Sequence, residues 1–148
     1  MKGSKKATAN GIGLLLARVP MGVFFLVLGY WKFHGGVNNF IQGHISQVPS
    51  MVPHDWGYRY LQAVPYAEMA VGTLLILGLL TRIAGGVGAA MIISFTIAAT
   101  GWKQEGLPFH PNLIFIGLLV AIMLVGPGKM SLDHLFFYEK PKPAPEQK

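Results

Sequence analysis

The chain has 148 residues, with a hydrophobic fraction of 52%, a charged fraction of only 12% and a net charge of +6. A soluble domain usually carries about 25% charged residues, so this composition favours an integral membrane protein. The absence of cysteine excludes disulfides, iron–sulfur clusters and Cys-ligated zinc. The basic residues lie in short segments beside apolar runs, which suits membrane lipid headgroups as a partner and argues against nucleic acid.

Four apolar helices are expected in chain order, forming an all-α, antiparallel up-and-down bundle of four transmembrane helices. The expected spans cover about residues 11–33, 60–80, 84–100 and 108–125. At about 1.5 Å per residue, 20 residues reach roughly 30 Å, the thickness of a bilayer core. We therefore predict a basic N-terminal segment over residues 1–10, a membrane domain over 11–138 and a disordered Pro-rich tail over 139–148.

The segments between the spans have distinct characters. The stretch 34–59 is rich in Gly, Asn, Gln, Ser, Pro and His and is expected to be one long loop. The short sequence "TRIAGG" joins the second and third spans, which makes them an antiparallel hairpin. After "GPG" stops the fourth helix, Ser131 is expected to be the N-cap of a short interfacial helix.

The distribution of basic residues predicts the orientation. Eight Lys and Arg residues lie on one side of the expected spans and three on the other, with Arg18 counted as intramembrane. By the positive-inside rule, both termini are then cytoplasmic and the 34–59 segment faces outward. The three outward residues are Lys32, Arg59 and Lys103, and the eight inward ones are Lys2, Lys5, Lys6, Arg82, Lys129, Lys140, Lys142 and Lys148.

Two charges stand inside apolar runs, and each shares a helix face with a glycine. On the first helix, Arg18 is followed at helical spacing by Gly22, Phe25, Gly29 and Lys32. On the second, Glu68 is followed by Gly72, Leu75, Leu79 and Arg82. The glycines predict close packing of these two faces, as small residues allow in membranes.

An isolated charge at the bilayer centre costs about 3 kcal/mol, so Arg18 and Glu68 need partners. Glu68 has three possible arrangements: a pair with Arg18, a pair with Lys32, or a water-filled space holding all three. These buried charges could form a structural ion pair or line a polar pocket for a ligand, and the sequence is compatible with both roles. On the third helix, a separate stripe of small residues predicts a packing face: Gly86, Ala90, Ser94 and Ala98.

In their order and spacing, these residues resemble the sequence pattern of the DoxX family of small membrane proteins. The first helix carries Arg18, Gly22, Gly29 and Lys32, and the chain closes with "NLIFIGLLVAIMLVGPGKMSLD". The second group of matching residues is Glu68, Gly72, Gly78, Thr81 and Arg82. The resemblance extends from about residue 14 to residue 133. It implies a four-helix bundle in a prokaryotic inner membrane and, for some members, a role as subunits of quinone-linked oxidoreductases such as thiosulfate:quinone oxidoreductase.

A quinone is the possible ligand, because it needs an apolar slot with a few hydrogen-bonding groups. The candidate polar residues are Arg18, Glu68, Lys32, Tyr30, Tyr66 and Asn112. The histidines are expected on the outer side of the membrane. His34 and His110 are the candidates for ligands of a metal or haem. Hydrogen bonding at the membrane interface is the favoured role of these histidines. No catalytic residue and no intrinsic cofactor are expected.

Three functions are compatible with these features. The first is an accessory or quinone-interacting subunit of a membrane oxidoreductase or electron-transfer complex, not catalytic alone and bound to other protein subunits. The second is a module that binds or transports a lipid or hydrophobic small molecule around Arg18 and Glu68. The third is a structural subunit of a larger membrane assembly.

Overall fold

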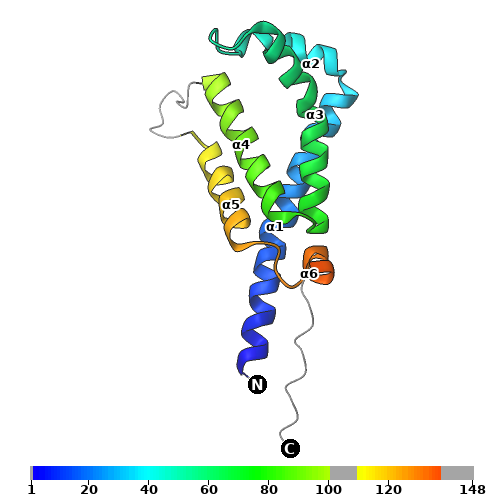
Figure 1. Ribbon diagram of the computed structural model, residues 1–148, viewed down its shortest axis with the longest axis vertical. Helices are drawn as coiled ribbons and strands as arrows, with labels where there is room; N and C mark the ends of the chain where they lie inside the picture. The colour runs from blue at the N-terminus through cyan, green and yellow to red at the C-terminus, as the bar shows by residue number, and fades with distance from the viewer. Residues whose placement is uncertain (1, 101–109, 138–148) are drawn as a thin grey trace, which may run out of the picture.

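The computed structural model describes residues 2–100 and 110–137, and all regular structure in these two ranges is helical (Figure 1). The elements are α1 (Lys2–His34), α2 (Val37–His44), the 3-10 helix η1 (Ile45–Gln47), α3 (His54–Leu77), α4 (Thr81–Thr100), α5 (Asn112–Val125) and α6 (Leu132–Phe137). The expected all-α class is confirmed.

The long helices associate in two pairs. The most extensive contact joins α1 to α3, and the next joins α4 to α5, while α3 and α4 link the pairs. In Figure 1, α2 lies across one end of these helices and α6 lies at the other. We refer to these as the α2 end and the α6 end.

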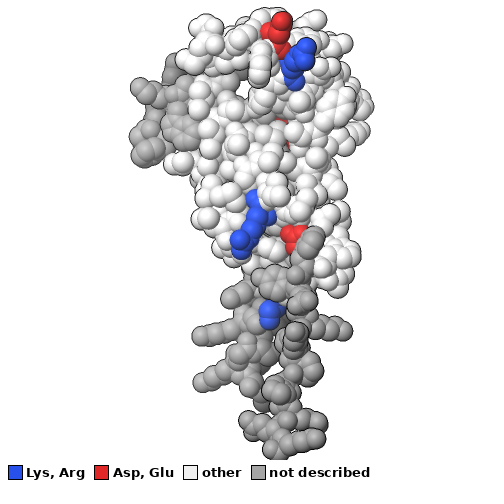
Figure 2. Space-filling view, in the orientation of Figure 1, with Lys and Arg blue, Asp and Glu red and all other residues white. Residues whose placement is uncertain are grey.

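Three helices are long and apolar enough to cross a membrane: Gly11–His34 within α1, His54–Leu77 and Thr81–Thr100. The fourth apolar helix, α5, has 14 residues and is shorter than that length. Two of its side chains, Ile114 and Leu124, are more than 60% exposed, as suits contact with lipid. Figure 2 shows the charged side chains near the two ends of the described part, with an almost uncharged surface between them.

The segment 34–59 was expected to be one loop, and the structure corrects this. It contains α2, η1 and the first turns of α3, which begins at His54 instead of near residue 60. Ile41 of α2 is only 2% exposed and belongs to the face that packs toward α3. The polar residues that suggested a loop, such as Asn38 and Asn39, occupy the exposed side of the same short helix.

The predicted glycine-mediated packing of α1 on α3 is confirmed. A Cβ atom placed on Gly22 would lie 2.8 Å from the carbonyl oxygen of Gly72, and one on Gly72 would lie 2.7 Å from that of Gly22. Farther along α1, a Cβ on Gly29 would lie 3.0 Å from the carbonyl oxygen of Pro65. The two backbones therefore approach too closely for any side chain at the first crossing point.

The predicted packing stripe on α4 is only partly correct. Ala90 is exposed and the other three members are half-buried, whereas Gly85, Gly88 and Ala89 are buried. A Cβ on Gly85 would lie 3.0 Å from the carbonyl oxygen of Leu119 on α5. In "AGGVGAA" small residues occupy almost every position, so spacing alone cannot identify the packed face.

The turn between α3 and α4 also differs from the predicted pattern. Gly78 has φ of 68° and ends α3, and Leu80 has φ of 49°. Arg82 therefore stands in the first turn of α4 and does not continue the helical face of Glu68, as the spacing suggested. Positive φ at Gly78 is available without strain because glycine has no Cβ.

Candidate functional site

The carboxylate of Glu68 forms an ion pair with the ammonium of Lys32, through Oε1. Glu68 is fully buried on α3, and the Lys32 side chain on α1 is 19% exposed. The second carboxylate oxygen, Oε2, has no hydrogen-bond partner among the described residues. Of the three arrangements that the sequence allowed for Glu68, the structure contains the pair with Lys32.

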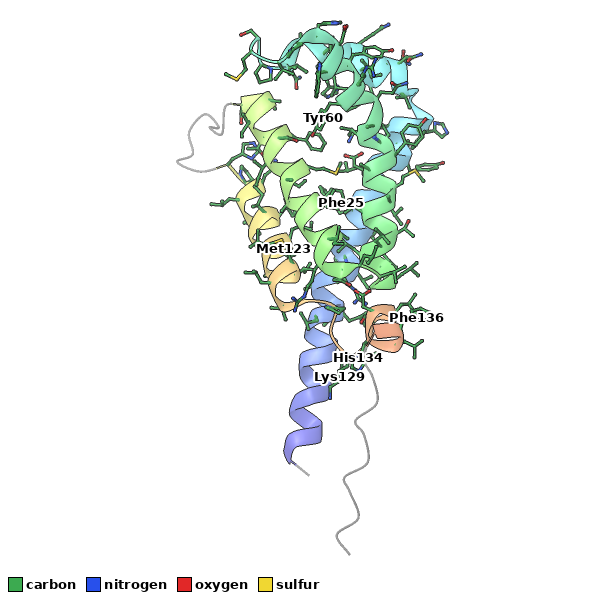
Figure 3. All side chains as sticks on the ribbon, in the orientation of Figure 1. Phe25, Tyr60, Met123, Lys129, His134 and Phe136 are labelled. Carbon is green, nitrogen blue, oxygen red and sulfur yellow. The ribbon has the colours of Figure 1, made fainter. Side chains whose placement is uncertain are left out.

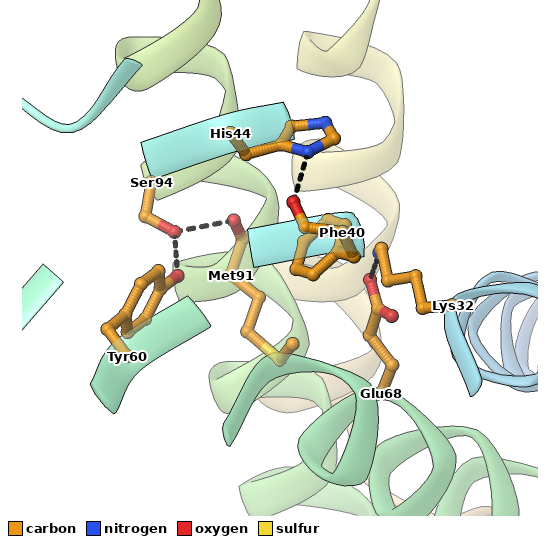
Figure 4. Close-up of polar contacts among 7 residues, drawn as sticks. All are labelled: Lys32, Phe40, His44, Tyr60, Glu68, Met91 and Ser94. Carbon is orange, nitrogen blue, oxygen red and sulfur yellow. Dashed lines mark hydrogen bonds and ion pairs between the residues drawn. The ribbon is translucent and has the colours of Figure 1, made fainter. Parts of the chain in front are cut away.

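Two aromatic rings surround the same ammonium group. The Lys32 Nζ atom lies 5.0 Å from the centre of the Phe40 ring and 5.4 Å from that of Phe95. Figure 4 shows Phe40 of α2 beside the Lys32–Glu68 pair. Ring faces attract cations at these distances, so the two rings hold the charge in place together with Glu68.

A cavity of about 700 Å³ opens beside this pair, and we call it the α2-end cavity. Lys32 contributes to its wall, and α2 and the segment after η1 contribute Phe40, His44 and Val52. The opposite walls come from α3 and α4, with Trp56, Leu61, Phe95 and Ala98 among them. Its size and largely apolar lining are those of a site for a small molecule.

Several polar groups along the cavity already have partners in the protein. The Nδ1 atom of His44 lies 2.8 Å from the carbonyl oxygen of Phe40. The hydroxyl of Tyr60 is hydrogen-bonded to that of Ser94, which donates to the carbonyl oxygen of Met91 at 2.8 Å (Figure 4). Lys32 differs, because an ammonium has three N–H donors and Glu68 accepts one of them.

Arg18 lies toward the other end of α1 and does not pair with Glu68. Its guanidinium donates from Nη1 to the carbonyl oxygen of Pro127 at 2.7 Å and from Nη2 to that of Met130 at 2.9 Å. The side chain is 2% exposed, so protein atoms rather than lipid surround it. Its partners belong to the segment between α5 and α6.

Asp133 of α6 makes a second set of contacts at this end. Its carboxylate accepts hydrogen bonds from the N–H of Leu80 at 2.7 Å and of Thr81 at 2.9 Å, at the start of α4. The N–H of Asp133 donates to the carbonyl oxygen of Gly78 at 2.9 Å. With Arg18, these contacts form what we call the α6-end cluster. Ser131 accepts a hydrogen bond from the N–H of His134 at 3.1 Å, which confirms it as the N-cap of α6.

The remaining polar candidates lie away from both charged groups. Tyr30 and Tyr66 are 55% and 60% exposed and contact neighbouring aromatic rings instead of the α2-end cavity. Asn112 donates from Nδ2 to the hydroxyl of Thr96 at 2.8 Å, a contact between α5 and α4. Tyr30, Tyr66 and Asn112 are not in the lining of the α2-end cavity, which contains Lys32.

The histidine candidates are also separate. His34 is exposed beside Tyr30 and Trp31, and the Nδ1 atom of His110 accepts a hydrogen bond from the N–H of Asn112 at 3.1 Å. Within residues 2–100 and 110–137, no three His, Asp or Glu side chains are grouped as a metal site requires.

The aromatic wall of the cavity was not predicted from the sequence. Phe40, Trp56 and Tyr60 were not among the candidates for a binding site, because 34–59 was expected to be a loop and residue 60 the start of a span. A signal was present: Phe40, Ile41 and His44 have the spacing of one face of a helix. This pattern predicts the amphipathic α2 that covers the cavity.

The DoxX family model matches residues 13–103, which is more than half of the chain. The match includes Arg18, Lys32 and Glu68 and ends before α5, so the closing segment up to residue 133 lies outside it. No curated protein and no solved structure shows a significant similarity to this chain. The chain belongs to the DoxX family.

Proposed function

We propose that this protein binds an apolar small molecule with an oxygen-bearing head in the α2-end cavity. The observation that carries the proposal is the position of Lys32, a cation on the wall of an apolar cavity of about 700 Å³. The Lys32–Glu68 pair holds the ammonium there, and its further N–H donors suit a carbonyl or carboxylate oxygen. A quinone has this chemistry, with carbonyl oxygens on a flat ring and an apolar chain.

Trp56 on the cavity wall provides the test, because a quinone quenches the fluorescence of a nearby indole. Trp31 and Trp102 are replaced by Phe, and the purified protein is titrated with decylubiquinone in detergent. We expect saturable quenching. Lys32→Met should weaken binding by roughly tenfold to a hundredfold, since a hydrogen bond to a charged group contributes about 1.5–3 kcal/mol. Lys129→Met, at the α6 end, should leave binding unchanged.

A second variant separates loss of binding from loss of folding. Ala98 lines the cavity, so Ala98→Leu should narrow it and weaken quenching without removing a charge. Ala90 is exposed on the same helix, and Ala90→Leu is the matched control. If the two variants bind decylubiquinone equally, or if quenching never saturates, the binding site is not this cavity.

The second candidate function is an accessory subunit of a quinone-linked membrane oxidoreductase, and membership of the DoxX family supports it. The test is extraction of native membranes in mild detergent, pull-down of the chain and identification of its partners by mass spectrometry. The expected result is that a dehydrogenase is recovered in stoichiometric amount and that Ala98→Leu lowers its quinone-dependent turnover. A large complex that keeps its activity when this chain is deleted would instead indicate a structural subunit.

We also propose that α5 is a fourth membrane crossing and that both termini are cytoplasmic in a prokaryotic inner membrane. The support is the packing of apolar α5 along α4 and the excess of basic residues on one side. Because the chain has no cysteine, single substitutions report accessibility directly. Asn38→Cys should react with an impermeant maleimide in intact bacteria, and Lys129→Cys only after permeabilisation. The reverse pattern, or reaction of both, would refute this topology.

A further inference from the structure

The α6 end of the molecule contains a groove of about 350 Å³ that the proposed function does not use. It lies between α1, the last turn of α3, and the segment leading into α6. Its walls include two basic residues, Arg18 and Lys129, and the apolar residues Leu15, Ile76, Leu77 and Leu135. We propose that this groove binds an anionic phospholipid.

The two parts of such a lipid match two levels of the groove. A Cβ atom on Gly11 would lie 3.8 Å from the Cβ of Lys129, so Lys129 stands at the level where the apolar part of α1 begins. Leu15 lies four residues farther into that apolar part, about 6 Å along the helix axis. A headgroup beside Lys129 would therefore place its acyl chains against Leu15 and Leu77.

The charge of the groove is complementary to a phosphate group. Lys129 is exposed, while Arg18 is buried in the wall. The Arg18 guanidinium is hydrogen-bonded to two neutral carbonyl groups, so its positive charge remains. The carboxylate of Asp133 is the acidic group of the α6-end cluster, and the N–H groups of Leu80 and Thr81 bind it. The lining of the groove thus contains two basic residues, and Asp133 is not part of it. Figure 3 shows Lys129 and His134 beside each other at this end.

The test compares two lipids with identical acyl chains, phosphatidylglycerol and phosphatidylcholine, added to the detergent-purified full chain and measured by native mass spectrometry. We expect preferential retention of phosphatidylglycerol. Lys129→Gln should reduce that preference about fivefold, the effect of one basic residue near a lipid surface. Arg59→Gln removes an equal charge from an exposed site on α3, toward the α2 end, and should change nothing.

The apolar wall is tested separately. Leu77→Ser should lower the retention of both lipids, whereas Leu124→Ser, an exposed leucine of α5 outside the groove, should not. Equal retention of the two lipids by the unmodified protein would overturn the proposal, and so would equal effects of Lys129→Gln and Arg59→Gln.

A free phosphate compound is the alternative source of the same chemistry. Glycerol 3-phosphate, added at the same concentration as phosphatidylglycerol, is expected not to displace the lipid, because it cannot occupy the apolar wall. Displacement would show that the groove recognises phosphate alone and would overturn the assignment to lipid. These measurements do not involve Trp56, so they succeed or fail independently of quinone binding.

Discussion

The two ends of the bundle use buried charge in different ways. At the α2 end, Lys32 pairs with another side chain and faces a cavity. At the α6 end, Arg18 and Asp133 bind backbone groups at two connections between helices. The contacts of Arg18 and Asp133 hold two connections between helices in one conformation, and Arg18 also borders the groove at that end. The contacts of Lys32 join only two side chains, and the ammonium keeps further N–H donors beside the α2-end cavity.

The largest expected effect comes from breaking the Lys32–Glu68 pair. Lys32→Met leaves the fully buried Glu68 without its partner, and removal of one member of a buried pair costs about 3–5 kcal/mol. The free energy of unfolding in mixed detergent–SDS micelles measures this loss. The double variant Lys32→Met/Glu68→Gln should recover more than half of it, and recovery of none would argue against direct pairing.

A smaller loss is expected at the α6 end. Arg18→Met leaves the partly buried carbonyl groups of Pro127 and Met130 without their donor, at about 1 kcal/mol for each. The folded fraction should bind decylubiquinone as the unmodified protein does. Arg82→Met, which removes an exposed arginine near the same end, is the control. A large change in quinone affinity would show that the two ends are not independent.

Asp133→Asn tests the other half of the α6-end cluster. Asparagine retains one acceptor oxygen for the N–H groups of Leu80 and Thr81 and loses the second, so we expect a loss of about 1 kcal/mol. Thermal unfolding in detergent measures the change. Asp55→Asn, at an exposed aspartate in the first turn of α3, should have a smaller effect. Equal effects of the two substitutions would mean that the hydrogen bonds from Leu80 and Thr81 to Asp133 contribute nothing to stability.

The smallest expected quantity is the coupling between the two ends. Arg18 and Lys32 are 14 residues apart on α1, about 21 Å along the axis, and they share no partner. The effects of Arg18→Met and Glu68→Gln should therefore add to within about 0.5 kcal/mol. A double-mutant cycle in the same micelles measures the coupling energy, and a value above 1 kcal/mol would show that the two ends depend on each other.

The helix faces were predictable where the sequence contains an asymmetric pattern. The buried face of α1 carries Arg18, Gly22, Phe25 and Gly29, and the spacing of these residues identifies it without a structure. In the first half of α4, small residues occur on almost every side of the helix, so their positions do not distinguish a packed face from an exposed one. The pattern therefore identified the packed face of one helix and missed that of the other.

The partners of the charged residues were not predictable to the same degree. Which cation meets Glu68 depends on how far α3 slides along α1, and helical spacing contains no information about that displacement. The partners of Arg18 are carbonyl groups, and every residue has one, so no residue type identifies them in a sequence. The cavity was missed because Phe40 belongs to α2, a helix shorter than the usual window for periodicity, and because Trp56 lies in the part of α3 that was expected to be loop.

The contacts of Arg18 span 109 and 112 residues of sequence, and those of Asp133 span 52 and 53. During synthesis, α1, α3 and α4 are made before the segment that binds Arg18 exists. The final form of the α3–α4 turn must likewise wait for Asp133. A nascent chain halted at residue 125 would hold an arginine and two peptide N–H groups without these partners, so assembly of this end is completed only after α6 emerges.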